Sequence, residues 1–575
     1  MFVDCGVVHM RETMKKQKNK KETWFVLGMV VLIATITGLP YLMPGLGCHL
    51  LDTLYHLLRI ESVKEAILNG AYPARVNPMF LNGYGYGSSL FYSDITLVVP
   101  AILRMLGVTP ILSWKIFVLC LTMAASCTTY YSLRYISDNI KYSITGTVLL
   151  LLSQYYLGDL HSRAGISEYA AFVFLPLLFA GIYDYFAKEG KRVWLLGVAF
   201  GGLILTHTIT TLICFMVTCG IFVSALLFEK TRKELLCPDK LKRLWITALL
   251  TVGVSVYFVF PMLEQMLTGE FWYQQSWAWI GDNTQPLKTF FYLKGNFGVI
   301  AELGIGIPIL LLLVSRLALG KIKNRWADAF LLLGVLLFIL STDIFPWKIL
   351  NNTLFNAIQF TYRLWPCALC AVILGIVVML SEKLTKGGTI LCVATIALSV
   401  AFGIYFHSDY RVAEETLTID DEFLEYNTIY IGQAEYLPAG VSWDVRMGAG
   451  EMDVVQAMDG PIALERSGYA QYRFSVEEAS DIYVLPLIYY KGYTAKLYTP
   501  ENPGDALEVL GTADGLVQVN KEASDAGEIV VCYGGTLLQR ISEWVSLITL
   551  IGIVVYIARK RCCNIHKMKD ENIVN

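Results

Sequence analysis

The sequence predicts a polytopic α-helical membrane protein with a β-rich domain near its C-terminal end. The first observation is composition, because 575 residues with 55% hydrophobic and 16% charged residues are too apolar for a water-soluble protein. The mean hydropathy of +0.52 agrees with this. The second observation is a change at residue 407, after which the chain turns polar and strand-like until about residue 540.

Window length predicts about thirteen membrane crossings. The first, residues 24–43, follows the basic run KKQKNKK (residues 15–21) and has no small-residue cleavage pattern, which favours an uncleaved anchor. The other expected crossings are 91–107, 111–136, 143–158, 168–187, 192–206, 208–228, 244–264, 297–316, 327–341, 363–381, 388–406 and 541–558.

Positively charged loops predict the orientation of the chain. AKEGKR, EKTRKELLCPDKLKR and the tail ARKRCCNIHKMKD favour the cytoplasm, together with residues 1–23 and 559–575. The transmembrane domain is then 24–406, with a first outer loop at 44–90, and the outer β-domain is 407–540. The three crossings expected between Asp52 and residue 159 would place residue 159 inside, so one crossing in 91–136 is expected to be split or re-entrant.

The β-domain is predicted from five strand-like runs separated by Gly, Asn, Asp and Pro. They read YAQYRFSV, DIYVLPLIYY, YTAKLYTP, LVQVN and GEIVVCY. We expect a sandwich outside the membrane, tethered at both ends by membrane helices.

The stretch after the first crossing predicts an amphipathic helix at the membrane interface. Asp52, His56 and Arg59 share one helical face, and leucines at 50, 51, 54, 57 and 58 share the opposite face. The polar stripe is expected to look into a water-filled space, and the leucines into lipid or other helices. A plain amphipathic spacer with a local charge network is the alternative.

A long irregular loop follows, NGAYPARVNPMFLNGYGYGSSLFY (residues 69–92), and loops of this length are usually functional or disordered. Together with HSRAGISEYAAFVFLPLLF (161–179), LTHTITTL (205–212), NAIQFTYRLW (356–365), EYLP (435–438) and IYYKGYTAKLY (488–498), it resembles the GT-C class of membrane glycosyltransferases. More narrowly, the chain resembles the YfhO-like bacterial membrane proteins, also described as 6-pyruvoyl-tetrahydropterin synthase-related. The chain departs from that family at three places where a proline-containing sequence is expected: Ser88-Ser89, Ser93-Asp94 and Thr361.

The resemblance implies an acidic residue in the first outer loop that serves as general base or metal ligand, and here it falls on Asp52. It also implies a polyprenyl-phosphate sugar donor and an acceptor on the outer face, either a cell-envelope glycopolymer or a glycolipid. A carboxylate can take the proton of the attacking hydroxyl or hold a divalent metal cation. The departing phosphate needs positive charge, for which Arg59, Arg163 and Arg363 are candidates.

Each companion residue has a structural alternative. His56 is a candidate catalytic residue or an interfacial histidine, and Arg163 and Glu168 are substrate ligands or anchors at the mouth of a span. His207 lies near the expected donor or merely in a hairpin turn. Gln359 and Arg363 form a phosphate clamp or a helix start.

The aromatic loop EFWYQQSWAWIGDN (residues 270–283) has two interpretations as well. Its rings could stack on sugars, but Trp and Tyr at a bilayer surface commonly form a belt, and we favour the belt.

Other function classes fit less well. The net charge of −2 provides no basic domain for nucleic acid, and no phosphate-cradling motif indicates a nucleotide-sugar donor. Most of the thirteen cysteines lie in apolar runs, so neither a disulfide framework nor a zinc site is expected. A lipid or glycan transporter is the main alternative, although no internal symmetry is visible. A glycan-binding protein without catalytic activity is the third possibility.

Overall fold

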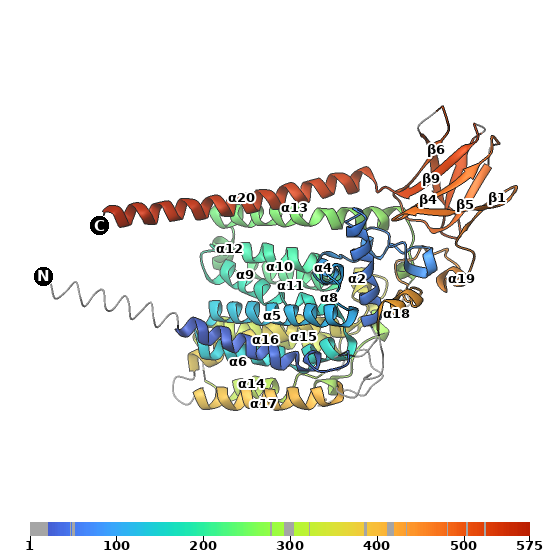
Figure 1. Ribbon diagram of the computed structural model, residues 1–575. Coiled ribbons are helices and arrows are strands. Elements are labelled where there is room, and N and C mark those ends of the chain that lie inside the picture. The colour runs from blue at the N-terminus through green and yellow to red at the C-terminus, as the bar shows by residue number, and fades with distance from the viewer. Residues whose placement is uncertain are drawn as a thin grey trace.

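A computed structural model shows a bundle of roughly parallel helices with a β-domain at one end (Figure 1). It describes residues 21–46, 48, 52–275, 279–291, 304–320, 322–383, 388–410, 419–432, 434–479, 481–501, 504–522 and 525–574. A helix covers residues 21–37. The labelled helices are α2 (Thr53–Leu68), α3 (Ser88–Phe91), α4 (Val98–Met105), α5 (Pro110–Ser137), α6 (Ile140–Leu151), α7 (Gln154–Leu157), α8 (Ile166–Ala171), α9 (Leu175–Ala187), α10 (Trp194–Ile204), α11 (Thr208–Leu226), α12 (Glu229–Leu235), α13 (Pro238–Thr268), α14 (Ile307–Ala318), α15 (Arg325–Leu340), α16 (Trp365–Lys383), α17 (Gly388–Tyr410), α18 (Asp421–Tyr426), α19 (Trp443–Arg446) and α20 (Leu537–Val574).

Seven helical stretches in the described residues are long and apolar enough to cross a membrane, and all seven were expected from sequence. They are Pro110–Ser137, Ile166–Ala187, Thr208–Leu226, Pro238–Thr268, Thr361–Lys383, Gly388–His407 and Leu537–Arg559. Four other apolar helices are shorter: Ile95–Met105, Ile140–Leu151, Trp194–Ile204 and Ile307–Ala318. A helix of twelve residues, such as α6, rises about 18 Å, less than the roughly 30 Å of a bilayer core. The count of thirteen crossings therefore stays a prediction.

The expected irregularity between residues 91 and 136 is confirmed. Helix α4 has only 8 residues and follows a 3₁₀ turn at Ile95–Leu97, so the run 91–107 is broken into short pieces. Part of another expected crossing, 297–316, lies outside the described residues, and α14 begins at Ile307.

Helix α16 is the centre of the bundle, since 94% of the most apolar 18-residue segment of Thr361–Lys383 is buried within the protein. Helices α13 and α20 lie side by side at the periphery (Figure 1), where only 22% and 11% of the corresponding segments are buried. Exposed apolar side chains on α20, including Ile548, Ile551 and Val554, fit a lipid-facing surface. These peripheral helices join the bundle to the β-domain.

Nine antiparallel strands form the β-domain: β1 (Val454–Ala457), β2 (Gly460–Ala463), β3 (Glu465–Gly468), β4 (Gln471–Val476), β5 (Asp481–Ile488), β6 (Tyr493–Tyr498), β7 (Asp505–Gly511), β8 (Leu516–Lys521) and β9 (Gly527–Tyr533). All five predicted runs form strands. The order is β2-β1-β5-β8-β7-β6-β9-β4-β3. The strands form one continuous sheet, because β7 pairs with both β6 and β8 and joins the two halves of the expected sandwich.

The sheet encloses a core of its own. Strands β8 and β9 alternate buried and more exposed positions, which directs Val517, Val519, Ile529 and Val531 inward. These four side chains are fully buried. The β-domain is thus a separately packed unit beside the membrane helices.

Helix α2 differs from the amphipathic interface helix expected from sequence. It runs across the long helices at the end of the bundle nearest the sheet (Figure 1), and most of its residues are buried, on the polar as well as the apolar stripe. Leu54, Leu57 and Leu58 pack into the protein core, while Leu50 and Leu51 lie outside the described residues. Tyr92, Ser93 and Asp94 of the following loop and Trp114 of α5 cover the face that sequence assigned to water.

We expect Leu54→Arg to reduce the amount of protein in the membrane several-fold, because Leu54 is 6% exposed and an unpaired buried charge costs several kcal/mol. Leu68→Arg on the same helix is the matched control, since Leu68 is 59% exposed. Quantitative immunoblotting of membranes measures both. Equal levels of the two variants would contradict the buried position of α2.

Candidate functional site

Asp52 lies directly before α2 and has an accessible side chain. Its carboxylate interacts electrostatically with Arg163 and Glu168, which are close together in sequence, and with Arg363, which comes from a distant part of the chain. Crowding by surrounding protein raises the carboxyl pKa above its ordinary value, and the two arginines oppose this. Asp52 is therefore accessible at the edge of a cluster of charged groups.

Arg163 occupies the centre of this cluster. Its Nη2 lies 2.7 Å from Glu168 Oε2 and 3.0 Å from Asp159 Oδ1, and Nη1 donates to the Tyr362 hydroxyl at 3.5 Å. The hydroxyl of Tyr155 donates to the other oxygen of Glu168 at 2.5 Å. Arg163 is thus an internal counter-ion for two buried carboxylates, which limits its expected role as a phosphate ligand.

Backbone geometry explains how these groups meet. Residues Gly158–Arg163 form a single stretch of π-helix that ends at Ala164, whose φ of 55° is left-handed. A π-helical turn is typical of functional sites because it redirects side chains that an α-helix would place elsewhere. The chain then enters α8, which carries Glu168 back toward Arg163.

Arg363 is the more available cation. Its Nη1 donates to Gln359 Oε1 at 2.6 Å and to the Ile358 carbonyl at 3.0 Å, so the predicted Gln359–Arg363 pair is formed. Nε of Arg363 is buried with no hydrogen-bond partner among the described residues. Within the part of the chain that the structure describes, no carboxylate lies within ion-pair distance of Arg363.

Gln359 fixes the position of Arg363 while its own backbone adopts a strained conformation. It follows a 3₁₀ turn and has φ 64° and ψ −48°, a conformation that non-glycine residues rarely adopt. The side-chain oxygen of this residue accepts the hydrogen bond from Arg363. Strain of this kind is found at functional sites.

His207 lies against the same cluster but serves first as a helix cap. Its Nδ1 accepts from the Thr210 backbone N–H at 3.3 Å at the start of α11, which leaves Nε2 to carry the proton. Burial lowers the pKa of His207 to about 3, with Glu168 acting in the opposite direction. His207 is a neutral donor beside the site.

His56 and Arg59 are corrected relative to the sequence interpretation, since neither faces open space. His56 is 3% exposed and stacks with Trp114 at 6.2 Å, and burial together with Arg59 lowers its pKa well below the ordinary value. Arg59 is 1% exposed and forms an ion pair with Asp94. Apolar and aromatic neighbours cover the face that a helical wheel showed as polar.

Arg59 has a clear structural effect. Its Nη2 also donates to the carbonyls of Tyr92 and Ser93 at 3.0 and 3.2 Å, and its guanidinium lies over the Tyr92 ring at 4.4 Å. These contacts fix the end of the first outer loop against α2. Arg59 therefore supports the loop that surrounds Asp52.

Sequence reasoning missed several members of the cluster. The site also contains Asp159, Tyr155 and Tyr362. Tyr92 is near it as well, because burial raises the pKa of Tyr92, Arg59 opposes this, and the Asp52 carboxylate adds to the increase. Asp159 and Arg163 are four residues apart just before a span, and this spacing could have predicted their ion pair. Tyr155 and Tyr362 gave none, since tyrosines are common in both regions.

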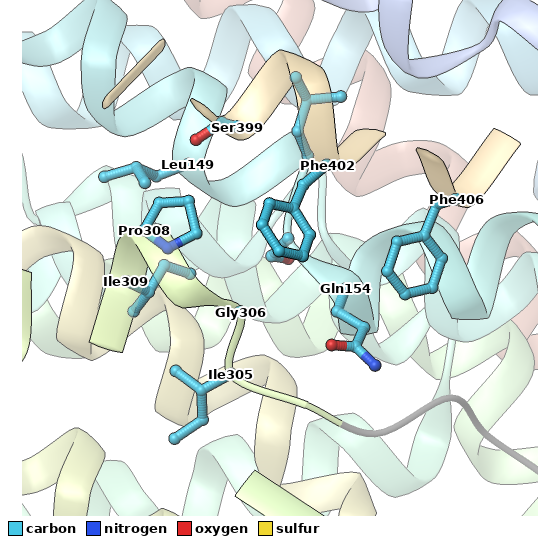
Figure 2. Close-up of a pocket in the computed structure, with 11 residues that line it drawn as sticks. Leu149, Gln154, Ile305, Gly306, Pro308, Ile309, Ser399, Phe402 and Phe406 are labelled. Atoms are coloured by element: carbon cyan, nitrogen blue, oxygen red, sulfur yellow. The ribbon is translucent and has the colours of Figure 1, made fainter. Parts of the chain in front are cut away.

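An apolar crevice lies within the bundle (Figure 2). It is bounded mainly by α6, α7, α14 and α17 and lined by Leu149, Gln154, Pro308, Ser399, Phe402 and Phe406, among others. Gln154 precedes Tyr155, the residue that donates to Glu168.

No metal centre is formed by protein groups in the described residues, where no three His, Cys, Asp or Glu side chains lie together suitably. Asp159 and Glu168 are engaged by Arg163, which leaves Asp52 as a single accessible carboxylate in this cluster. The ten cysteines whose side chains are described are free thiols.

Comparisons with known proteins give distant matches. No family model matches the chain. An uncharacterized protein of Lactococcus lactis subsp. cremoris (strain MG1363) is 25% identical over 315 residues, which are 52% of this chain and 50% of that protein, so the match spans about half of that relative.

Among solved structures, the arabinofuranosyltransferase AftD from Mycobacteria matches with a TM-score of 0.40 and 14% identity. The match covers 69% of this chain and 28% of that chain. AftD is a glycosyltransferase.

We expect Arg163→Met to lower the free energy of unfolding by about 3–5 kcal/mol, because it leaves a buried carboxylate without its counter-ion. The thermal unfolding midpoint of detergent-purified protein measures this. Arg466→Met is the matched control, since Arg466 lies on the exposed strand β3. An unchanged midpoint for Arg163→Met would show that the buried ion cluster does not stabilise the fold.

Proposed function

We propose that this protein is a membrane glycosyltransferase that moves a sugar from a polyprenyl-phosphate donor to a cell-envelope acceptor outside the membrane. The observation that supports this most is that an accessible carboxylate, Asp52, interacts electrostatically with Arg363, a cation that forms no ion pair within 4.0 Å in the described residues. One group suits an acceptor hydroxyl and the other a phosphate. The GT-C-like motifs of the sequence agree with this assignment.

The proposed reaction is a direct displacement at the anomeric carbon. The acceptor oxygen forms the new bond to that carbon, and the bond from carbon to phosphate oxygen breaks, with its electron pair leaving on the phosphate. Asp52 accepts the proton of the acceptor hydroxyl, and its raised pKa makes it a better base than an ordinary aspartate. Arg363, held by Gln359, stabilises the charge on the departing phosphate.

Other groups would bind and orient the donor. Nε2–H of His207 is a donor for a sugar hydroxyl or a phosphate oxygen, and Arg163 keeps Glu168 and Asp159 in place. These contacts would hold the donor while Asp52 and Arg363 act on the reacting atoms.

The arrangement of the chain fits chemistry on the outer face. The C-terminal end of α20 lies at the opposite end of the bundle from the sheet and α2 (Figure 1). With the basic tail in the cytoplasm, the β-domain and Asp52 would both lie outside. Polyprenyl-linked sugars would reach this site within the membrane.

Asp52→Asn should abolish transfer without loss of protein, because the change preserves size and removes the proton acceptor. Mass spectrometry of envelope glycans and lipid-linked sugars compares wild type, a deletion strain and the variant at equal expression. We expect both mutant strains to lose one glycan decoration and accumulate its lipid-linked donor.

Asp138→Asn is the matched control, since Asp138 is exposed at the end of α5, where its left-handed φ suits Asn. A normal glycan profile in Asp52→Asn would contradict the assignment. A defect confined to the deletion strain would favour the transporter or the non-catalytic glycan-binding protein.

The pH dependence should follow the Asp52 carboxyl. The base must be deprotonated and its pKa is raised above 3.8, so activity should fall on acidification at a higher pH than for an ordinary aspartate. His56 is buried and neutral, so His56→Gln should leave this acid limb in place. Initial transfer rates in membranes at varied pH measure both. An acid limb that disappears in His56→Gln would contradict the account.

A further inference from the structure

An aromatic cluster lies at the junction of the bundle and the β-domain. The aromatic loop after α13 pairs with a segment that precedes the sheet, because Trp272 N donates to the Leu437 carbonyl and Ala439 N to the Glu270 carbonyl, both at 2.9 Å. This pairing places Trp272 beside the residues of α19. Residues 276–278 of the same loop lie outside the described residues.

Arg446 of α19 is held between two tryptophan rings. Its guanidinium lies 5.2 Å from the ring centroid of Trp272 and 4.8 Å from that of Trp443. Trp443 is 62% exposed. Throughout the described ranges, the Arg446 side chain has neither a hydrogen-bond acceptor nor a carboxylate partner, so its N–H donors are available to a ligand.

The position of this stack argues against a membrane belt. Helix α19 lies beyond the end of the bundle, below the sheet and past the end of α13 (Figure 1). Belt aromatics lie at the level where the spanning helices leave the bilayer. This argument applies to Trp443 of α19, and the belt interpretation of residues 270–283 stays a prediction.

The same segment of the chain connects this stack to Asp52. Its upstream part is fixed to the first outer loop, where Leu81 N donates to the Thr428 carbonyl at 2.9 Å. Tyr430 follows, with 39% of its surface exposed, and the Asp52 carboxylate contributes to its raised pKa after burial. Exposed aromatic rings thus occur at both ends of residues 430–443.

We propose that the Trp272–Arg446–Trp443 stack binds an acidic glycan, with a sugar ring on the open face of Trp443 and a carboxylate or phosphate group on Arg446. Aromatic faces bind the apolar faces of sugars, and a planar guanidinium pairs two oxygens of an anionic group. This inference rests on the proposed function, in which the bound glycan is the acceptor and its growing end reaches Asp52. The acceptor is then an anionic envelope polymer.

Binding of envelope oligosaccharides to the purified full-length protein tests this. Oligosaccharides are released from the envelope of the producing strain by mild acid and separated by anion exchange into a charged and a neutral pool. We expect the charged pool to bind wild type and Asp52→Asn equally. Trp443→Ala and Arg446→Gln should each weaken binding by about tenfold or more, and Trp443→Phe should restore most of it.

Tyr498→Ala is the matched control, because Tyr498 is a 39% exposed aromatic residue on strand β6. Binding of the neutral pool alone, no binding of either pool, or unchanged binding by Trp443→Ala would each overturn the inference. Binding only to phosphatidylglycerol vesicles would overturn it in favour of a membrane contact. If Asp52→Asn is fully active while Trp443→Ala loses glycan binding, the glycan site stands and the catalytic proposal fails.

Discussion

The pairing of buried charges determines how this end of the molecule is built. A charge inside an apolar bundle costs several kcal/mol unless an opposite charge and hydrogen bonds compensate it. Arg59 pairs with Asp94, Arg104 with Glu61, and Arg163 with Asp159 and Glu168. Asp52 and Arg363 form no such ion pair in the described residues, which is why we propose that these two groups act on a ligand.

The supporting ion pairs tie distant segments of the chain together around the site. Arg59 ties the end of the first outer loop to α2, and Arg104 connects α4 to Glu61 and to Asp421 of α18. The segment before the sheet is thereby fixed beside α2. Segments far apart in sequence are brought together around Asp52 by ion pairs and backbone hydrogen bonds rather than by one continuous helix.

Sequence predicted the helices that apolar length alone determines and the strands with strong alternation, such as β4 and β6. It did not predict β3 and β7, since ERSG and DALEVLG expose most of their side chains and owe their structure to neighbouring strands.

Periodicity placed Asp52, His56 and Arg59 on one face correctly. It gave no information on the elements that cover that face, so it misassigned His56 and Arg59 to water. The contacts among Arg163, Glu168 and Arg363 depend on a π-helical turn and a strained Gln359, which no local pattern announces.

The most direct measurement concerns the lipid-linked donor itself. Native mass spectrometry of protein purified in nanodiscs can detect a lipid-linked sugar that stays bound. The account predicts that Asp52→Asn retains the donor, because binding is intact and transfer is blocked, while Arg363→Gln loses it, because the phosphate has lost its cation. Equal retention by both variants, or no lipid-linked sugar on Asp52→Asn, would contradict the proposed pairing of Asp52 with Arg363.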